Sequence, residues 1–459
     1  MLKKLYTTLF LLGLFFFSFN EYKGIPLLGE FKSEAGAIFF LLGFLVLLVE
    51  SGFTKKIGIP LKDPIFQILL IFIFWCFICT VFNIKTVESN YFKHTGGVNR
   101  FIRQYFALVL SSIIFFLFYY NVIRKMELKD ILFKIRKVFF LSLIVASAYG
   151  FLEIVVTNFG FGFLYPVLKG FDYFPFLEVV LHNAGRISSI AYEPPFFAIY
   201  LITVSGWMFS YVLTEEKAWR FIPSILVLIL TFFSGSRTGL MVVFFQLFIF
   251  CTILYRDKKF KYYFVKSLSG FLILFSVLFL FKGEKIINAV SQKIESLDFI
   301  GNLKTNMSNQ SRFGLQYASL QVFKENPIVG VGFGQQSYHG RKHYPIWAVK
   351  DNYEFELFYK NKNEKSFPPG YNLYVRLLAE TGIIGFGIML TLIYFSIKKT
   401  RILIKYSTKE KQILSFILLI SLSGLFINWL QIDTFRIYGI WLSLAILIRL
   451  SQDKIILNE

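Results

Sequence analysis

The stretch TFFSGSRTGLMVVFF places one arginine at a bend between two apolar runs. Gly235 and Gly239 allow a tight turn there. Ser236 or Thr238 can cap the helix that follows. Arg237 then lies beside a helix N-terminus, and both features attract anions, phosphate groups above all. We therefore expect Arg237 to bind an anionic group.

A second set of polar residues opens the apolar run HNAGRISSIAYEPPFFAIYL, which carries His182, Arg186 and Glu193. Arg186 either binds a diphosphate through its planar guanidinium group or anchors the chain at lipid head groups. Glu193 stands directly before two prolines at the start of an apolar segment, where a carboxylate needs a partner. Arg186 or Arg237 can supply that partner.

The segment YHGRKHYP contributes His339, Arg341, Lys342 and His343. Two histidines at i and i+4 share a metal ion only on a helix, which the glycine and proline of this segment oppose. No Cys, Asp or Glu nearby completes a ligand set, so the sequence predicts neither a metal site nor a cofactor. The basic residues suit lipid phosphates or an anionic glycan, and either histidine can act as a general base.

The stretch PPGYNLYVRLLAETGIIG leads from the longest polar segment into an apolar run. Arg376 and Glu380 are four residues apart and can pair on one face of a helix. Asn372 can cap the same helix at its start. We expect a capped, internally paired first turn at the entrance to a membrane-like segment.

Three alternating glycines occur in KENPIVGVGFGQQ, at positions 330, 332 and 334. The run is neither a P-loop nor a dinucleotide fingerprint, because the residues that must follow those motifs are missing. We predict a structural turn. The preceding SRFGLQYASLQVFKENP has the pattern of a helix, with Ser311 as its cap and Pro327 beyond its end.

These groups stand in a chain of 459 residues, of which 56% are hydrophobic, 20% aromatic and 17% charged. A soluble domain carries roughly a quarter charged residues, so the composition predicts a polytopic membrane protein. The net charge of +21 does not indicate a nucleic-acid partner, because the basic residues form short runs between apolar segments. Cys76 and Cys79 lie inside one apolar segment and are expected to be ordinary helix residues.

Apolar runs of about 20 residues cross a hydrocarbon layer of about 30 Å as helices. The sequence therefore predicts an all-α polytopic membrane protein with about 12 transmembrane helices and one large extracytoplasmic loop containing short helices. The first span is expected to be an uncleaved helix, since no small-residue cleavage site follows its basic start. The predicted spans are residues 5–20, 34–53, 64–82, 104–122, 138–158, 191–213, 221–235, 238–255, 266–282, 374–397, 413–432 and 436–452.

Lysine and arginine set the predicted orientation. The run KKTRILIKYSTKEK has six basic residues and one acidic residue, whereas residues 283–371 have eleven basic and eight acidic ones. The positive-inside rule then places both termini in the cytoplasm and the 283–371 loop outside. Spans 1–9 fall in residues 1–282 and spans 10–12 in residues 372–459, and the whole forms a single membrane domain.

The order of SGSRTGL, SRFGLQYASLQVFKENPIVGVGFGQ and YNLYVRLLAETGIIGFG resembles the O-antigen polymerase and O-antigen ligase superfamily, mainly over residues 186–400. Its members have about a dozen spans and one large external loop. The resemblance implies glycosyl transfer from an undecaprenyl-diphosphate-linked glycan at the outer face of the bacterial cytoplasmic membrane, without a metal. The products would be O-antigen, capsular polysaccharide or exopolysaccharide. The implied partners are donor and acceptor glycans, membrane lipids, a flippase and a chain-length regulator.

The resemblance also assigns roles to residues. Arg237, then Arg186, then Arg312 would correspond to the external arginines that hold the donor diphosphate and stabilise its charge as it leaves. Arg237, Arg186, Glu193, His339 and His343 form the predicted catalytic set. The predicted substrate-binding residues are Arg312, Arg341, Tyr371, Asn372 and Arg376.

One residue departs from the family pattern. Ligases have a histidine directly before the asparagine that opens the span after the loop, whereas this chain has Tyr371 before Asn372. A tyrosine with a pKa near 10 is a weak base at neutral pH, which favours a polymerase. Glu193, His339 and His343 are then the alternative bases. A ligase and a non-enzymatic flippase of lipid-linked sugars are the other hypotheses, and the scarcity of ionisable groups inside the spans opposes the flippase.

Overall fold

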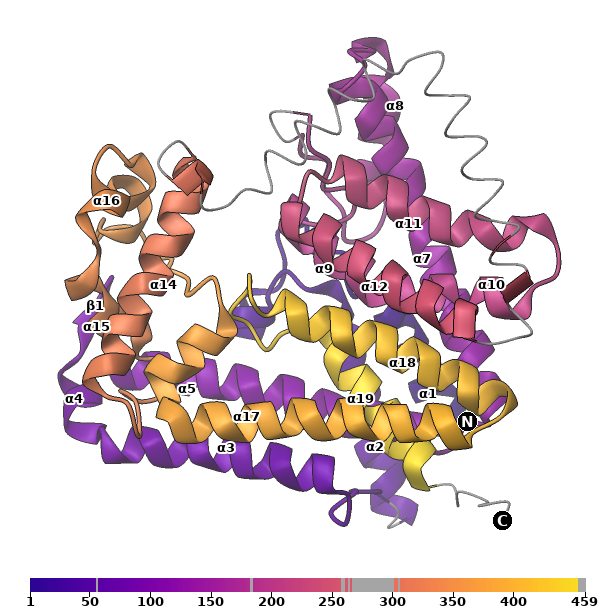
Figure 1. Ribbon diagram of the computed structural model, residues 1–459, viewed down its shortest axis with the longest axis horizontal. Coiled ribbons are helices and arrows are strands. Elements are labelled where there is room, and N and C mark those ends of the chain that lie inside the picture. Colours follow the sequence, from indigo (N-terminus) through magenta and orange to yellow (C-terminus); the bar gives the residue numbers. More distant parts are fainter. Residues whose placement is uncertain are drawn as a thin grey trace.

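The computed structural model describes residues 1–54, 57–181, 185–256, 261–262, 265, 301–303 and 306–452, and these are mostly helical (Figure 1). Two short strands, β1 (Tyr91–Phe92) and β2 (Thr95–Gly96), pair antiparallel in one hairpin. The α-helices are α1 (Leu2–Phe15), α2 (Ala35–Thr54), α3 (Pro64–Phe82), α4 (Ile84–Ser89), α5 (Gly97–Val109), α6 (Phe116–Ile123), α7 (Leu128–Thr157), α8 (Tyr165–Lys169), α9 (Pro194–Phe209), α10 (Tyr211–Thr214), α11 (Ile222–Phe233), α12 (Arg237–Arg256), α14 (Met307–Glu325), α15 (Gln336–Gly340), α16 (Ile346–Val349), α17 (Leu373–Tyr406), α18 (Lys409–Asn428) and α19 (Tyr438–Gln452).

The predicted fold class, an all-α polytopic membrane protein, is confirmed. Within the described residues, eight helices are long and apolar enough to cross a membrane, and they coincide with eight of the twelve predicted spans. Two further spans, predicted at 221–235 and 436–452, are shorter apolar helices. The first predicted span is the 14-residue α1, and the ninth, 266–282, lies outside the described residues.

Several helices begin earlier than their apolar runs suggest. The helix predicted from 138 begins at Leu128, so most of the basic run before it is helical. The helix predicted from 104 begins at Gly97 and continues through a π-helical segment, Leu110–Phe115, into α6. Hydropathy marks only the part of a helix that meets hydrocarbon, whereas backbone hydrogen bonding continues into polar turns.

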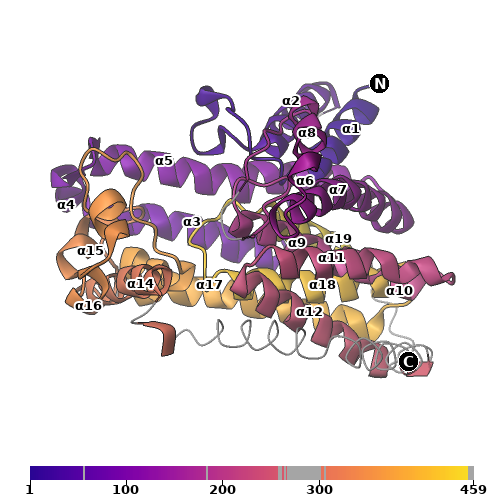
Figure 2. The same ribbon diagram turned by 90° about the horizontal axis from the view of Figure 1, so that it is seen from above.

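Long helices lie side by side along the molecule. Both views show α3, α5 and α17 extended together, with α14, α15 and α16 gathered at one end (Figures 1 and 2). Large apolar side chains on the spanning helices are exposed, among them Phe74 at 64% and Phe248 at 68%. Such exposure on helices of this length is typical of lipid-facing surfaces.

The end formed by α14, α15 and α16 belongs to the predicted large loop, whose described part does contain short helices, as expected. The predicted cap Ser311 is wrong, because α14 begins at Met307 and the side chain of Asn306 accepts a hydrogen bond from the Asn309 amide. Ser311 is buried within the helix, where its hydroxyl accepts a hydrogen bond from Asn352 Nδ2 at 3.0 Å.

Helix α17 is interrupted at Gly382, which has φ +65° and ψ −169°. The carbonyl groups freed by the interruption find other donors. Val331 N donates to Ala379 O at 3.0 Å, and Gly332 N donates to Glu380 O at 3.0 Å. The three glycines of the GVGFG run all have positive φ, so the predicted structural turn is confirmed, and it packs against this interruption.

A second long connection, between α7 and α9, was not expected as an elaborated segment. Its described residues include α8 and two 3₁₀ turns, Gly162–Leu164 and Gly170–Tyr173. Its last part runs back toward the membrane helices and carries Arg186 and Glu193. His182 lies outside the described residues.

Candidate functional site

Three arginines from distant parts of the chain meet in the structure. Arg186 precedes α9, Arg237 is the first residue of α12, and Arg312 lies in the first half of α14. All three are half-buried, and each is close enough to another for their charges to interact. We call this group the arginine cluster. The sequence predicted these three residues individually, and the fold brings them together.

Arg237 is held by the turn between α11 and α12. Gly235 has φ +62°, which lets the chain reverse there. Ser236 caps α12, since its hydroxyl accepts a hydrogen bond from Gly239 N at 3.2 Å. The second predicted turn glycine, Gly239, instead lies within α12, where an added Cβ would meet Ala198 at 2.6 Å. The Arg237 guanidinium donates to Asn309 Oδ1 on α14 at 2.7 Å, which ties α12 to the loop.

Arg186 lies against the same turn. Ile187 N donates to Phe233 O at 3.2 Å, and Arg186 Nε donates to Ser234 O at 3.4 Å. A Cβ on Gly235 would come within 2.8 Å of Arg186 Cγ. Burial, reinforced by the nearby charge of Arg312, lowers the pKa of the Arg186 guanidinium below its usual value.

The segment that follows Arg186 depends on a residue that sequence reasoning missed. Glu153 of α7 is fully buried and accepts hydrogen bonds from Ser188 N at 3.2 Å and Ser189 N at 2.9 Å. A buried carboxylate requires such donors. The sequence did contain a signal for this role of Glu153. It is an acidic residue inside the apolar helix predicted at 138–158, and such residues rarely lack a specific partner.

Glu193 immediately precedes α9 and is half-buried. Burial raises the pKa of its carboxyl group above the ordinary value, while Arg186 and Arg312 act in the opposite direction. Arg186 and Arg312 thus act on Glu193 through their charges, although none of the ion pairs in the described part of the chain joins Glu193 to either arginine.

Arg312 connects the arginine cluster to the start of α17. Its guanidinium lies over the ring of Tyr371, 5.1 Å from the centroid, and donates to Gln431 Oε1 at 3.3 Å. Tyr371 has φ +52°, and its hydroxyl lies 2.9 Å from that of Tyr359. Burial raises the pKa of the Tyr371 hydroxyl, which Tyr359 and Arg312 partly oppose.

Asn372 caps α17 as predicted. Its side-chain oxygen accepts hydrogen bonds from Tyr374 N at 3.0 Å and Val375 N at 3.2 Å. Its Nδ2 faces Gln316 Oε1 of α14 at 3.4 Å. The cap thereby fixes where Tyr371, one residue earlier, meets α14.

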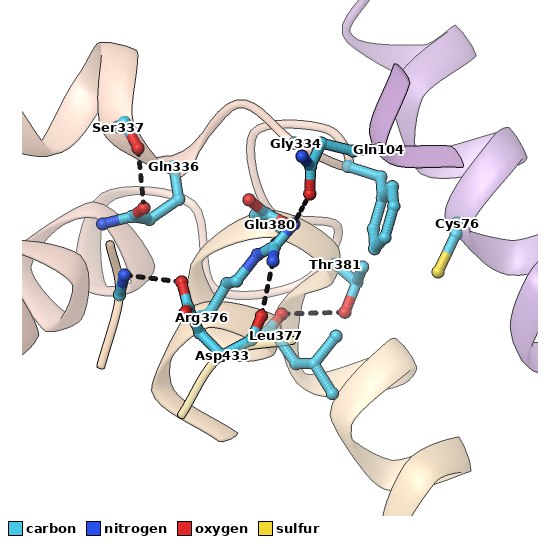
Figure 3. A network of polar contacts seen from close by, with 12 residues as sticks. Cys76, Gln104, Gly334, Gln336, Ser337, Arg376, Leu377, Glu380, Thr381 and Asp433 are labelled. Carbon is cyan, nitrogen blue, oxygen red and sulfur yellow. Dashed lines mark hydrogen bonds and ion pairs between the residues drawn. The ribbon is translucent and has the colours of Figure 1, made fainter. Parts of the chain in front are cut away.

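Arg376 and Glu380 form the predicted pair, with Arg376 Nε 3.1 Å from Glu380 Oε2 and both side chains buried. Figure 3 shows the surrounding network. Arg376 also donates to the Asp433 carbonyl at 2.6 Å and to Gln104 Oε1 at 3.1 Å. These contacts join α17 to α5 and to the segment before α19.

The two histidines lie away from the arginine cluster. His343 Nε2 is 3.2 Å from Glu325 Oε2, at the opposite end of α14 from Arg312. Glu325 lies thirteen positions after Arg312 in the same helix, which corresponds to about 20 Å. Burial lowers the pKa of His339 below its ordinary value. Arg341 is exposed and lies over the Phe92 ring, 4.9 Å from its centroid.

The described residues therefore contain a half-buried site with three guanidinium groups, one carboxylate of raised pKa and a half-buried tyrosine. Such a site can bind a multiply charged anion, because arginine forks match phosphate oxygens and partial burial strengthens the attraction. Among the described residues, no group of three His, Cys, Asp or Glu is placed to hold a metal ion.

Comparison with known proteins bears on the same elements. A protein-family model described as O-antigen ligase matches residues 222–390. The matched region runs from α11 to the first half of α17 and includes Arg237, Arg312 and Tyr371. No curated protein matches the chain. Over residues 222–390 the chain thus carries the sequence pattern of the O-antigen ligase and polymerase superfamily, a family of glycosyl-transferring membrane proteins, and the resemblance predicted from its motifs is confirmed.

Proposed function

We propose that the chain polymerises oligosaccharide repeat units linked to undecaprenyl diphosphate, at the outer face of the bacterial cytoplasmic membrane. The observation that carries this proposal is the convergence of Arg186, Arg237 and Arg312 beside Glu193. The donor is a growing glycan on its carrier lipid, and the acceptor is another lipid-linked repeat unit. A flippase would deliver the units, and a chain-length regulator would act with the polymerase.

The arginine cluster would hold the donor diphosphate. An acceptor hydroxyl oxygen attacks the anomeric carbon of the first donor sugar and forms the new glycosidic bond. The bond between that carbon and the diphosphate oxygen breaks, and its electron pair leaves with the diphosphate. Guanidinium groups already in place stabilise this charge without reorganising. The displaced carrier is undecaprenyl diphosphate.

Glu193 would accept the proton of the attacking hydroxyl. Its carboxylate lies beside two of the arginines, whereas His343 pairs with Glu325 at the far end of α14. The raised pKa of Glu193 makes its ionised form a better base than an ordinary glutamate. The geometry therefore favours Glu193 over the two histidines.

Tyr371 supports polymerase over ligase. It occupies the position of the ligase histidine, and burial moves the pKa of its hydroxyl further above neutral pH. Its contacts with Arg312 and Tyr359 suit a residue that positions the arginine cluster. The ligase remains the alternative, because the matching family model is described as O-antigen ligase.

Arg237→Ala tests the proposal. Loss of one preorganised charge at a leaving group lowers the rate by roughly 10²-fold or more. In the cells that make the glycan, the variant should reach the membrane, form no long chains and accumulate single lipid-linked repeat units. Arg103→Ala is the matched control, since Arg103 pairs with Glu30 on an exposed surface at 2.8 Å. This variant should polymerise like the wild type.

Other outcomes would separate the alternatives. Long chains formed at the wild-type rate by Arg237→Ala would contradict the proposed role of the arginine cluster. If cells with the Arg237→Ala variant also lacked single lipid-linked units in the outer leaflet, this would indicate a flippase. Finished polymer that stays on its carrier lipid after deletion of the protein would indicate a ligase.

A further inference from the structure

The loop around α15 and α16 forms an open pocket of about 570 Å³, which we call the loop cavity. This volume falls within the roughly 300–1,000 Å³ of small-ligand sites. Five cationic side chains line it, and they come from three separate segments of the loop. They are Arg341 and Lys342, from the turn after α15; Lys350, directly after α16; and Lys360 and Lys362, from the segment after the π-helical turn Phe355–Tyr359.

Few carboxylates neutralise these cations. Lys360 pairs with Glu356 at 3.1 Å. In the part of the chain that the structure describes, Arg341, Lys342, Lys350 and Lys362 form no ion pair. Like charges around one hollow repel each other, and an anion inside it offsets that repulsion. The loop cavity therefore selects for negative charge.

The rest of the lining is apolar and partly aromatic. It consists of Phe92, Tyr344, Ile346, Val349 and Tyr359. Phe92 and Tyr359 are only 5% and 7% exposed, and Arg341 lies over the Phe92 ring. The apolar surface open to a ligand therefore comes mainly from Ile346, which is 82% exposed. A bare anion or a lipid head group would need only the cations. Cations beside an exposed apolar side chain fit a sugar chain that bears carboxylates, because sugar rings also present apolar C–H faces.

The loop cavity is held by packing and hydrogen bonds beneath it. Phe355 and Tyr359 pack with Leu315 and Ala348 in a small apolar core. The hairpin that supplies Phe92 is tied down by Lys93, whose ammonium donates to the Ser366 carbonyl at 2.6 Å. A site held in this way loses little conformational freedom when a ligand binds.

The loop cavity is also connected to the arginine cluster. Tyr359 lines the cavity, and its hydroxyl lies 2.9 Å from that of Tyr371. The Tyr371 ring in turn lies under the Arg312 guanidinium. Two hydrogen-bonded tyrosines thus lie between the loop cavity and the arginine cluster.

We propose that the loop cavity binds carboxylate-bearing sugar units of the glycan whose diphosphate end is held at the arginine cluster. This inference rests on the proposed glycan transfer and adds a substrate class to it, namely repeat units that contain acidic sugars. The spread of single-charge lysines over three segments suits carboxylates distributed along a chain, whereas the clustered arginine forks suit one compact diphosphate.

The test measures binding by the full-length protein in nanodiscs of phosphatidylcholine. The probe is tetragalacturonate, and maltotetraose serves as its neutral counterpart of equal length. We expect tetragalacturonate alone to bind, with an affinity that falls as salt rises. Lys342→Gln/Lys350→Gln/Lys362→Gln should weaken this binding about tenfold or more, the sum of three modest ionic contacts.

A matched triple variant controls for general electrostatic attraction. Lys85, Lys324 and Lys365 are exposed lysines that do not line the cavity, and their replacement by glutamine changes the net charge equally. This variant should bind tetragalacturonate like the wild type. The proposal would be overturned if both triple variants lost tetragalacturonate binding equally, or if maltotetraose bound as well as tetragalacturonate. It would also be overturned if phosphatidylglycerol nanodiscs competed with tetragalacturonate for the cavity lysines.

The binding test separates this inference from the proposed polymerase activity, because it requires no turnover. Arg237→Ala should leave tetragalacturonate binding unchanged, since Arg237 does not line the loop cavity. If polymerisation proved absent while acidic probes still bound, the proposed function alone would fail. If polymerisation were present while the cavity variant bound the probe like the wild type, the loop cavity proposal alone would fail.

Discussion

Glu193 and Tyr371 both lie within reach of the Arg312 charge, and burial acts on both in the same direction. It raises the pKa of the glutamate carboxyl group, which brings that pKa nearer to neutral pH and makes the ionised form a better base. It also raises the pKa of the tyrosine hydroxyl, which was already far above neutral. One environment thus favours the glutamate as the base and leaves the tyrosine protonated.

Glu193→Gln should therefore lower kcat of transfer by roughly 10²–10⁴-fold, the usual contribution of a general base. The sign of the pH dependence follows from the same residue. The base must be ionised, so wild-type activity falls as the pH falls through the raised pKa of Glu193. This decline should begin at a higher pH than for an ordinary glutamate. A pH–rate profile of wild type and variant measures both effects.

The control for this prediction is Glu88→Gln, which changes an exposed glutamate on α4. It should keep the wild-type rate and profile. A Glu193→Gln protein that retained the same decline at low pH would show that another group titrates, and the assignment of the base would be wrong.

At the residue scale, the sequence pointed to individual charged groups but not to most of their neighbours. Arg237, Arg186 and Glu193 drew attention because an ionisable residue beside an apolar run is costly at membrane depth and usually has a specific partner or role. The Arg376–Glu380 pair followed from helical spacing and is present at 3.1 Å. The bond from Arg237 to Asn309 and the support from Glu153 join residues far apart in the chain, which no local pattern encodes.

At the scale of elements, the interruption of α17 positions the start of that helix. Gly382 adopts a backbone conformation that is nearly restricted to glycine. Ile383 N donates to Pro327 O at 2.9 Å, and Trp75 Nε1 donates to Thr381 O at 2.9 Å. The segment from Leu373 to Thr381, which carries Arg376, is thereby docked onto the glycine-rich turn and α3.

Gly382→Ala should destabilise the protein by about 3 kcal/mol or more. The alanine would carry a strained backbone, which alone costs roughly 1–3 kcal/mol, and its Cβ would approach Ile328 O to 2.1 Å. Thermal unfolding in detergent should show a Tm lower by several degrees, on the order expected for such a loss. Transfer activity should fall as well, because Tyr371 and Asn372 would move relative to α14.

Gly387→Ala in the same helix is the matched control. An added Cβ there meets nothing within 4 Å, and the residue has no positive φ. Alanine is favoured over glycine in helices by about 1 kcal/mol, so Tm should stay the same or rise slightly. Equal destabilisation by both substitutions would show that the interruption at Gly382 has no special role.

The type of each secondary-structure element could be predicted from the sequence more reliably than the residues at which it begins and ends. Twelve apolar runs and a helix at 311–325 could be read from periodicity and length. The cap of α14 was misplaced because both Asn306 and Ser311 are good cap residues, and only tertiary burial of Ser311 against Asn352 decides between them. The interruption of α17 was not foreseen, because glycine is common in membrane helices without breaking them.

At the scale of the whole molecule, the length of α17 separates two chemically different ends. Its segment after the interruption at Gly382, residues 383–406, extends about 36 Å, enough to cross the roughly 30 Å of a hydrocarbon layer. One end meets α14 and the arginine cluster. The other end carries Lys398, Arg401 and Lys405. The positive-inside rule predicts that this basic end lies in the cytoplasm and the loop outside.

Single cysteines test that orientation. Ser366→Cys lies in the loop and Thr408→Cys in the turn between α17 and α18, and both positions are exposed. The native Cys76 and Cys79 are buried and Cys251 is half-buried, so a Cys251→Ser background keeps labelling of the native thiols low. A membrane-impermeant maleimide applied to intact spheroplasts should label Ser366→Cys, and Thr408→Cys only after permeabilisation. The reverse pattern would invert the molecule and place the arginine cluster on the cytoplasmic side. Labelling of both positions before permeabilisation would contradict the reading of α17 as a spanning helix.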